Sequence, residues 1–202
     1  MLNQDEKTTS KSKEEDESIS FIVEKPFEDD INTIFFTGDV SEESANRLII
    51  ELVECSRIAE DKEDAEDIKI YLNTEGGSAY EMFAIYDAMR IMREECEIQT
   101  LGLGKVMSAG VLLLAAGTKG SRKIGKNCRV MIHSVMGGQH GPVFNLENEM
   151  EEVKWLQEQY VDSLIEETDM TKRYIKKLLA RKVNVYLTAR EAVELGIADE
   201  VI

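Results

Sequence analysis

The sequence predicts an α/β fold made of repeated β-α-β units, from which one long helix protrudes. Short apolar segments that are typical of buried strands alternate along the chain with amphipathic helical segments. Because such alternation requires right-handed crossovers, the strands are expected to form a parallel sheet. The long helix is indicated by an amphipathic stretch over about residues 144–167, which is large for a chain of 202 residues.

The strands and helices follow one another in a regular order. Apolar side chains recur at helical steps between the strands, as in Ala45, Leu48 and Leu52. The segment 111–116 is apolar all round, which is expected of a helix buried in the core. The predicted elements are a strand at 33–37, a turn at 38–39, a helix capped by Ser41, a strand at 68–72, a helix at 80–93, and strands at 97–103 and 129–133.

The last third of the chain has a different composition. Residues 136–142 are rich in glycine, and the long amphipathic segment that follows carries one apolar stripe. A helix of this length packs either on the core of its own domain or on a partner subunit, and the pattern does not choose between them. Beyond it, a helix at 172–181 leads to the segment 183–187, and Thr188 and Glu191 have the spacing of a capping box.

The distribution of apolar residues suggests a tail followed by one domain. Residues 1–18 are rich in Lys, Glu, Ser and Thr, so a disordered acidic and polar N-terminal tail is predicted. Residues 19–202 are expected to form a single domain, which is long enough for a substantial core. Within it, about residues 134–167 are expected to form a projecting handle.

Composition argues against several classes of function. The chain has 40 acidic and 24 basic residues, and its formal net charge of −16 argues against nucleic acid or an anionic membrane as a partner. No apolar run reaches the length of a membrane span, and the N-terminus lacks the pattern of a signal peptide. Three cysteines at unpaired spacings favour a reducing compartment. A cytoplasmic protein is therefore expected, with no metal and no cofactor, since no nucleotide-binding signature is present.

Ser108 stands where a glycine-bearing strand runs into the apolar helix. A helix start offers unpaired N–H groups and the positive end of the helix dipole, which is what an acyl-transfer nucleophile and its oxyanion require. Taken alone, however, Ser108 is more simply an N-cap residue, because the chain has no Gly-x-Ser-x-Gly elbow around it.

The two histidines and a pair of glycines extend this candidate site. His133 ends an apolar strand, where a parallel sheet presents functional side chains, whereas His140 lies in the glycine-rich segment and is expected to be exposed. Gly76 and Gly77 follow another strand and precede a helix, so their N–H groups are placed to face an anion. Each feature has a plain structural explanation, but their joint occurrence at three strand ends favours a catalytic site.

Seven short motifs follow one another over about residues 31–202. They are Asn73-Thr-Glu-Gly-Gly, Ala84-Ile-Tyr-Asp, Gly104 to Ser108, Ala115-Ala-Gly-Thr-Lys-Gly, Arg129-Val-Met-Ile-His, Gly137-Gly and Leu187-Thr-Ala-Arg-Glu-Ala-Val-Glu-Leu-Gly-Ile-Ala-Asp. In this order and at this spacing they resemble the Clp protease proteolytic subunits, the ClpP family of self-compartmentalised serine peptidases. The resemblance implies a ClpP/crotonase-like superhelix of β-α-β units.

The resemblance also implies a role for individual residues. The nucleophile falls on Ser108 and the general base on His133, while Asn184 stands where the family usually has the aspartate of the triad. Glu75 replaces a usual proline, and Ala109 replaces a usual methionine. The implied oxyanion donors are the backbone N–H groups of Gly77 and Ala109, and the implied substrate-binding residues are Gly76, Met136, Gly137, Gly138 and Gln139.

The function implied by the resemblance is that of a serine endopeptidase core that does not itself use ATP. It would form two stacked heptameric rings and hydrolyse unfolded polypeptides fed by a separate AAA+ unfoldase. Asn184 leaves alternatives open: a catalytically weak or silent ring subunit, a capsid-maturation protease, or an acyl-CoA enzyme of the crotonase type. The last would use the paired N–H groups on a thioester, but it needs a carboxylate in the pocket and no Ser/His pair.

Overall fold

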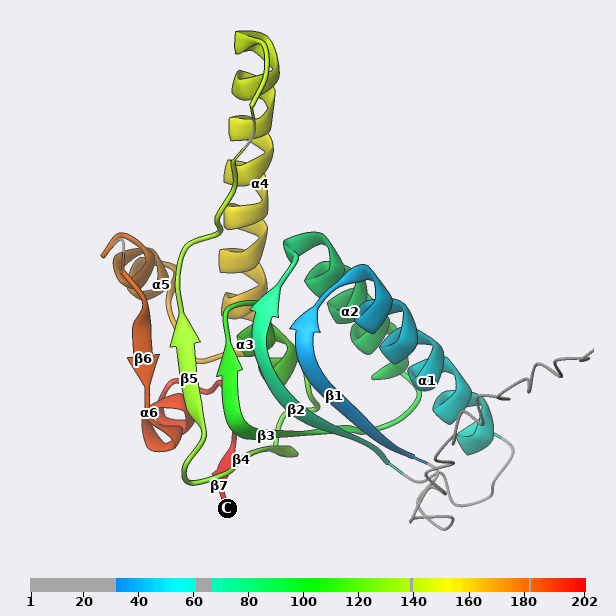
Figure 1. Cartoon of the computed structure of the whole chain (residues 1–202). Coiled ribbons are helices and arrows are strands. Elements are labelled where there is room, and N and C mark those ends of the chain that lie inside the picture. Colours follow the sequence, from blue (N-terminus) through cyan, green and yellow to red (C-terminus); the bar gives the residue numbers. More distant parts are fainter. Residues whose placement is uncertain (1–31, 61–66, 139, 182) are drawn as a thin grey trace, which may run out of the picture.

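The computed structural model describes residues 32–60, 67–138, 140–181 and 183–202, so the predicted tail at 1–18 lies outside the described residues. The described part of the chain is built on a seven-stranded sheet, covered by helices, from which one helix projects (Figure 1). Every strand pair in it is parallel except one. The predicted α/β fold with a protruding helix is therefore confirmed.

The middle strand of the sheet changes its partner halfway along. The strands are β1 (Thr33–Val40), β2 (Ile68–Gly77), β3 (Ile98–Met107), β4 (Arg122–Ile124), β5 (Arg129–Ile132), β6 (Val185–Leu187) and β7 (Glu200–Val201). Residues 100–102 of β3 pair with β4, whereas residues 105–107 pair with β5. Gly104 separates the two halves with a φ of +64°, a conformation that glycine adopts without strain. The second half of β3 thus ends beside β5.

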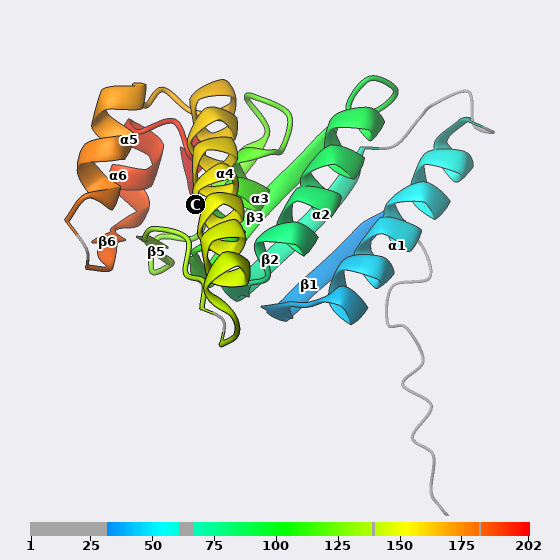
Figure 2. The same ribbon diagram turned by 90° about the horizontal axis from the view of Figure 1, so that it is seen from above.

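Helices cover the sheet and fill its middle. They are α1 (Glu42–Glu60), α2 (Ala79–Met92), α3 (Ala109–Ala115), α4 (Val143–Glu167), α5 (Lys172–Leu179) and α6 (Ala189–Glu194). Figure 2 shows α1 and α2 side by side on one face of the sheet, with α4 next in the same layer. Every residue of the short helix α3 is buried, as its all-apolar sequence predicted.

The ends of the first strands differ from the prediction. Strand β1 was expected to end at Thr37, but it continues through a bulge at Gly38 to Val40. Strand β2 likewise continues to Gly77, because Asp39 and Val40 pair with the two glycines at its end. Pairing with a neighbouring strand overrides the turn-forming tendency of glycine at these positions. Strand β6, which runs antiparallel to β5, is in the described sheet the one departure from the parallel sheet that the alternation of strands and helices predicted.

Helix α4 has its buried side chains in its second half. Leu156, Tyr160 and Leu164 are buried, whereas Val143 and Phe144 near its start are exposed and the helix stands clear of the body in Figure 1. The apolar stripe seen in the sequence therefore packs on the core of the chain only in its second half.

A buried ion pair holds the end of α4. The Glu167 carboxylate accepts hydrogen bonds from both terminal nitrogens of Arg93, at 2.9 and 2.6 Å, and from the Tyr86 hydroxyl at 2.9 Å. Burial raises the pKa of Glu167, but the hydrogen bonds and charge of Arg93 outweigh it, so that the pKa lies below its ordinary value. The carboxylate stays ionised and links α4 to α2.

Candidate active site

Ser108 occupies a strained turn between β3 and α3. With φ 53° and ψ −120°, it has the only positive φ of any non-glycine residue that the structure describes. Its side chain makes no capping hydrogen bond to α3, so the simpler N-cap interpretation does not describe it. A non-glycine residue in such a conformation costs about 1–3 kcal/mol and is found mainly at functional sites.

The hydroxyl of Ser108 faces His133 instead. Its Oγ lies 2.8 Å from His133 Nε2, within hydrogen-bond distance. In the tautomer with hydrogen on Nδ1, Nε2 accepts the serine proton, as a general base must. The other histidine, His140, is exposed and does not line the cavity around Ser108.

Asn184 stands just before β6 and, among the described residues, has no hydrogen bond to this pair. The antiparallel ladder of β5 and β6 ends with Ile132 opposite Val185. If the same register continued by one residue beyond the strands, His133 would stand opposite Asn184. Directly opposed side chains in such a ladder lie on the same face of the sheet. Asn184 is exposed, and among the described residues no hydrogen bond joins it to His133. Its position is compatible with the role implied by the resemblance, but its side chain is not engaged.

The two glycines at the end of β2 are packed tightly, Gly76 against the nucleophile and Gly77 against β1. A Cβ at Gly76 would lie 2.6 Å from the Cβ of Ser108, and one at Gly77 would lie 2.2 Å from the carbonyl oxygen of Val40. Neither position therefore tolerates a side chain. The N–H of Gly76 donates to Thr74 Oγ1 at 3.0 Å, whereas that of Ala109 is at the first position of a helix and has no intrahelical acceptor.

These residues line one cavity of about 650 Å³. Ser108, Ala109 and His133 lie in its wall together with Gly76, Gly77, Met136 and Gly137. Gly138 and Asn184 do not line it, and Gln139 lies outside the described residues. Met136 is 81% exposed, and the segment 134–138 pairs with no strand of the described chain. Most of the predicted site is thus brought together at one place.

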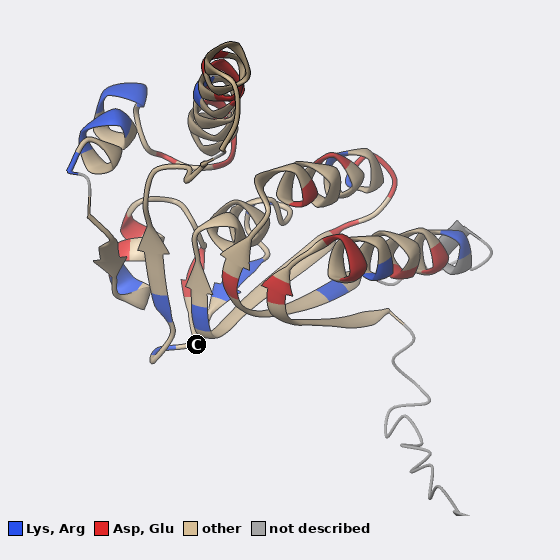
Figure 3. Cartoon of the chain, turned by 45° about the horizontal axis from the view of Figure 1, so that its top comes forward, with Lys and Arg blue, Asp and Glu red and all other residues tan. Residues whose placement is uncertain are grey.

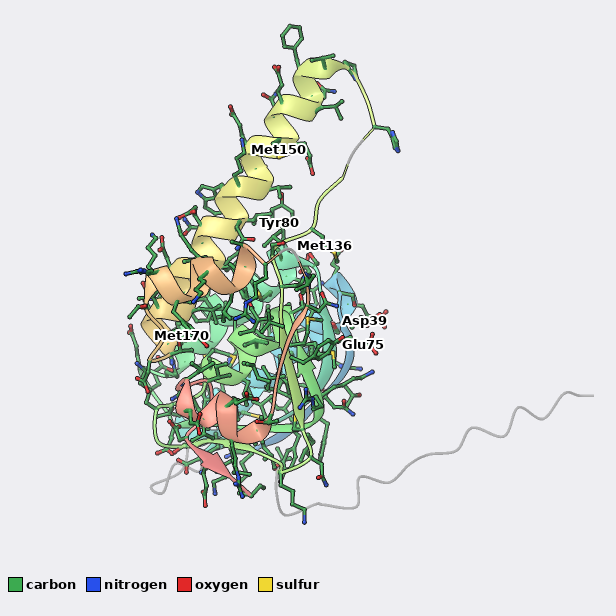
Figure 4. The ribbon with its side chains drawn as sticks, turned by 90° about the vertical axis from the view of Figure 1, so that its left-hand side faces the viewer. Asp39, Glu75, Tyr80, Met136, Met150 and Met170 are labelled. Carbon is green, nitrogen blue, oxygen red and sulfur yellow. The ribbon has the colours of Figure 1, made fainter. Side chains whose placement is uncertain are left out.

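Carboxylates at the rim of the cavity were not predicted. Asp39, Glu75 and Glu149 line it, and Figure 4 shows Asp39 beside Glu75, with Tyr80 and Met136 nearer the base of α4. The hydrogen bond and charge of Lys105, 2.6 Å from Glu75, hold the pKa of that carboxyl below its ordinary value. The charged residues in the cavity wall are all acidic, which matches the acidic colouring near the strand ends in Figure 3.

Helix α4 supports the site through two further hydrogen bonds. The Tyr160 hydroxyl donates to the carbonyl oxygen of Ser108 at 3.2 Å, and Gln157 Oε1 accepts from the N–H of Val135 at 2.8 Å. The sequence signal at both positions is an ordinary helical repeat, which gave no reason to single them out.

Comparison with known proteins identifies the family of peptidases to which this fold and site belong. A sequence model described as "Clp protease" matches residues 15–202, so the chain belongs to the Clp protease family. It is 34% identical to "ATP-dependent Clp protease proteolytic subunit 1" of Prochlorococcus marinus strain MIT 9312 over 169 residues, which are 84% of this chain and 83% of the relative. The protein of the same name from strain CCMP1986 is 36% identical over 84% of this chain and 82% of the relative.

The described residues contain neither a membrane-spanning helix nor a cluster of metal ligands. No helix among them is both long and apolar enough to cross a membrane. Over the ranges that the structure describes, no group of three or more His, Cys, Asp or Glu side chains is arranged to hold a metal ion.

The contact between Gly76 and Ser108 leads to a first prediction. Gly76→Ala is expected to lower the reactivity of Ser108 toward a fluorophosphonate at least about a hundredfold, because the new methyl group displaces the nucleophile. The rate of labelling of the folded protein measures this.

Gly120→Ala is the matched control for that variant. Gly120 has a φ of +96° against +95° for Gly76, so both substitutions strain the backbone alike, but a Cβ at Gly120 meets nothing within 4 Å. Equal labelling rates for the two variants would contradict the proposed packing of Gly76 on the nucleophile.

Proposed function

We propose that this chain is a serine endopeptidase that works as the proteolytic subunit of a self-compartmentalised protease. The observation that carries the proposal is the 2.8 Å contact between Ser108 Oγ and His133 Nε2 at the wall of the cavity. Membership of the Clp protease family supports peptide-bond hydrolysis as the reaction.

In the proposed mechanism Ser108 Oγ attacks the carbonyl carbon of a peptide bond while His133 takes its proton. The oxyanion that forms accepts hydrogen bonds from the N–H groups of Gly77 and Ala109. His133 then returns the proton to the leaving amine, and in the second half of the reaction it activates the water that hydrolyses the acyl-enzyme. No step requires a cofactor.

The substrate in this proposal is an extended, unfolded polypeptide. The segment that contains Met136 and Gly137 lines the cavity and pairs with no strand of the described chain, so a substrate strand is able to add to it. Backbone pairing of this kind supplies affinity with little choice of sequence. An AAA+ unfoldase is the proposed source of such chains, because the fold of a native protein leaves no extended strand to bind.

The proposed assembly is two stacked heptameric rings. Val143, Phe144 and Met150 on the projecting half of α4 are more than half exposed, and apolar side chains gathered on one helix favour burial against another subunit. Cys96 and Cys128 are free thiols, which supports the cytoplasm as the proposed location.

The three alternative functions are distinguished by the results of activity experiments rather than by features of the structure. A silent ring subunit would keep the fold and the cavity without reactivity at Ser108. A capsid-maturation protease would share the chemistry and differ in its substrate. A crotonase-type enzyme would use a cavity carboxylate, but the contact between Ser108 and His133 and the family membership favour a peptidase.

The direct test of the proposal is the variant Ser108→Ala. It is expected to abolish both fluorophosphonate labelling and hydrolysis of a fluorogenic peptide, with the oligomer intact by sedimentation. Ser121→Ala is the control, since the Ser121 hydroxyl donates to Glu97 and lies outside the cavity wall. Hydrolysis by Ser108→Ala at the wild-type rate would overturn the serine mechanism. A wild-type oligomer that is intact but not labelled would support the silent subunit.

Asn184 generates a separate prediction. An aspartate in the third position of a triad orients the histidine and stabilises its charged form, and its replacement by asparagine costs about 10⁴ in turnover in the chymotrypsin-type case. Asn184→Asp is therefore expected to raise peptide hydrolysis at least about tenfold, equivalent to roughly 1.4 kcal/mol of transition-state stabilisation. The measurement is kcat of the assembled variant. An unchanged kcat would mean that Asn184 is not the third member of the triad.

A further inference from the structure

The Tyr160 hydroxyl is the only side-chain group of the described residues that donates a hydrogen bond to the backbone of Ser108. The side chain is 3% exposed, and its oxygen lies 3.2 Å from the carbonyl oxygen of Ser108. The same carbonyl also accepts from the N–H of Val111 at 3.0 Å, so it has two donors. Tyr160 belongs to α4, which is distant in sequence from the nucleophile and contacts it from another layer.

This hydrogen bond acts on the peptide group that links Ser108 to Ala109. A trans peptide is planar, and its C=O and N–H point in opposite directions. Whatever fixes the direction of the Ser108 carbonyl therefore also fixes the direction of the Ala109 N–H. That N–H is one of the two donors proposed for the oxyanion. By bonding to the carbonyl oxygen at the opposite side of the same peptide group, Tyr160 therefore also fixes the direction of this N–H.

The local backbone needs such support. Ser108 has φ 53° and ψ −120°, a conformation that persists only where the surrounding structure determines it from more than one side. On the other side of the residue, the N–H of Ser108 donates to the carbonyl of Met131 in β5 at 2.8 Å. On the carbonyl side of Ser108, the hydrogen bond from Tyr160 opposes rotation of the peptide group that links Ser108 to Ala109.

We propose that Tyr160 is a positioning residue that holds the Ser108–Ala109 peptide with its N–H directed at the oxyanion. The inference rests on the proposed serine peptidase function. It distinguishes Tyr160 from its buried neighbours on α4, Leu156 and Leu164, which fill space without a polar contact. A hydrogen bond to the carbonyl also polarises the peptide and strengthens the N–H as a donor.

The phenol keeps its proton, and with it this role, at neutral pH and well above it. Burial raises the pKa of Tyr160 well above its ordinary value, so the hydroxyl remains protonated and remains a donor. The hydrogen bond from Tyr160 to Ser108 is therefore not expected to titrate at neutral pH.

The test compares two buried tyrosines that each lose only a hydroxyl group. Tyr160→Phe removes the donor to Ser108, and Tyr86→Phe removes a hydroxyl that is bonded to Glu167, away from the cavity wall. Phenylalanine keeps the volume of the ring, so neither variant opens a cavity. The assembled proteins are compared by kcat and KM for a fluorogenic peptide, normalised to the number of sites that a fluorophosphonate titrates, and by thermal unfolding.

A peptide boronate supplies a second readout. Ser108 Oγ adds to the trigonal boron, its proton passes to His133, and one boron hydroxyl takes the place of the oxyanion. Tyr160→Phe is expected to lower kcat and the affinity for the boronate each about tenfold, while KM changes less than about twofold. Tyr86→Phe is expected to lower the unfolding temperature and leave kcat, KM and boronate affinity unchanged.

The outcomes separate this inference from the proposed function. Equal kcat for the two variants, or a Tyr160→Phe effect confined to KM or to the unfolding temperature, would overturn the positioning role while leaving the serine mechanism in place. A wild-type oligomer that is neither labelled nor able to hydrolyse peptides would overturn the proposed function and the role of Tyr160 with it.

Discussion

The pairing of β3 with β5 is the constraint on which the candidate site depends. Met107 lies opposite Met131 in this parallel register, so Ser108 and His133 leave the sheet within two residues of a common point. This pairing of β3 with β5 is possible because the pairing of β3 with β4 stops before Gly104. Without that change of partner, the serine and the histidine would end different parts of the sheet and the 2.8 Å contact between them would not form.

The rest of the site is built around this pair from three further elements. The end of β2 packs Gly76 against Ser108, Asn184 stands just before β6, and α4 supports the carbonyl of Ser108 through Tyr160. Helix α4 also carries the exposed apolar residues of the projecting half. Helix α4, which is proposed to contact other subunits, is thus also the helix whose Tyr160 bonds to the carbonyl oxygen of Ser108. The buried pair of Arg93 and Glu167 fixes the end of that helix to the body.

The sequence predicted those parts of the site that have a local signal. Ser108 and His133 stand at the ends of apolar strands, and the glycine pair follows a third, so strand order alone suggested that they meet. Tyr160 could not be found in this way, because an aromatic residue in an apolar helical stripe is usually core filling. The carboxylates at the cavity rim, Asp39 and Glu149, come from a strand extension and from the handle, and their meeting depends on packing that no local pattern encodes.

Identification of an acyl-enzyme tests the central claim most directly. The wild-type oligomer, quenched in acid during turnover of an activated peptide ester, is digested and its peptides are analysed by mass spectrometry. The account predicts that the acyl group is found on Ser108 and on no other residue. Among the described residues it is the hydroxyl of Ser108 that contacts a histidine, and the N–H of Ala109 lies beside it. Continued turnover with the acyl group on another residue, or with none detectable on Ser108, would contradict it.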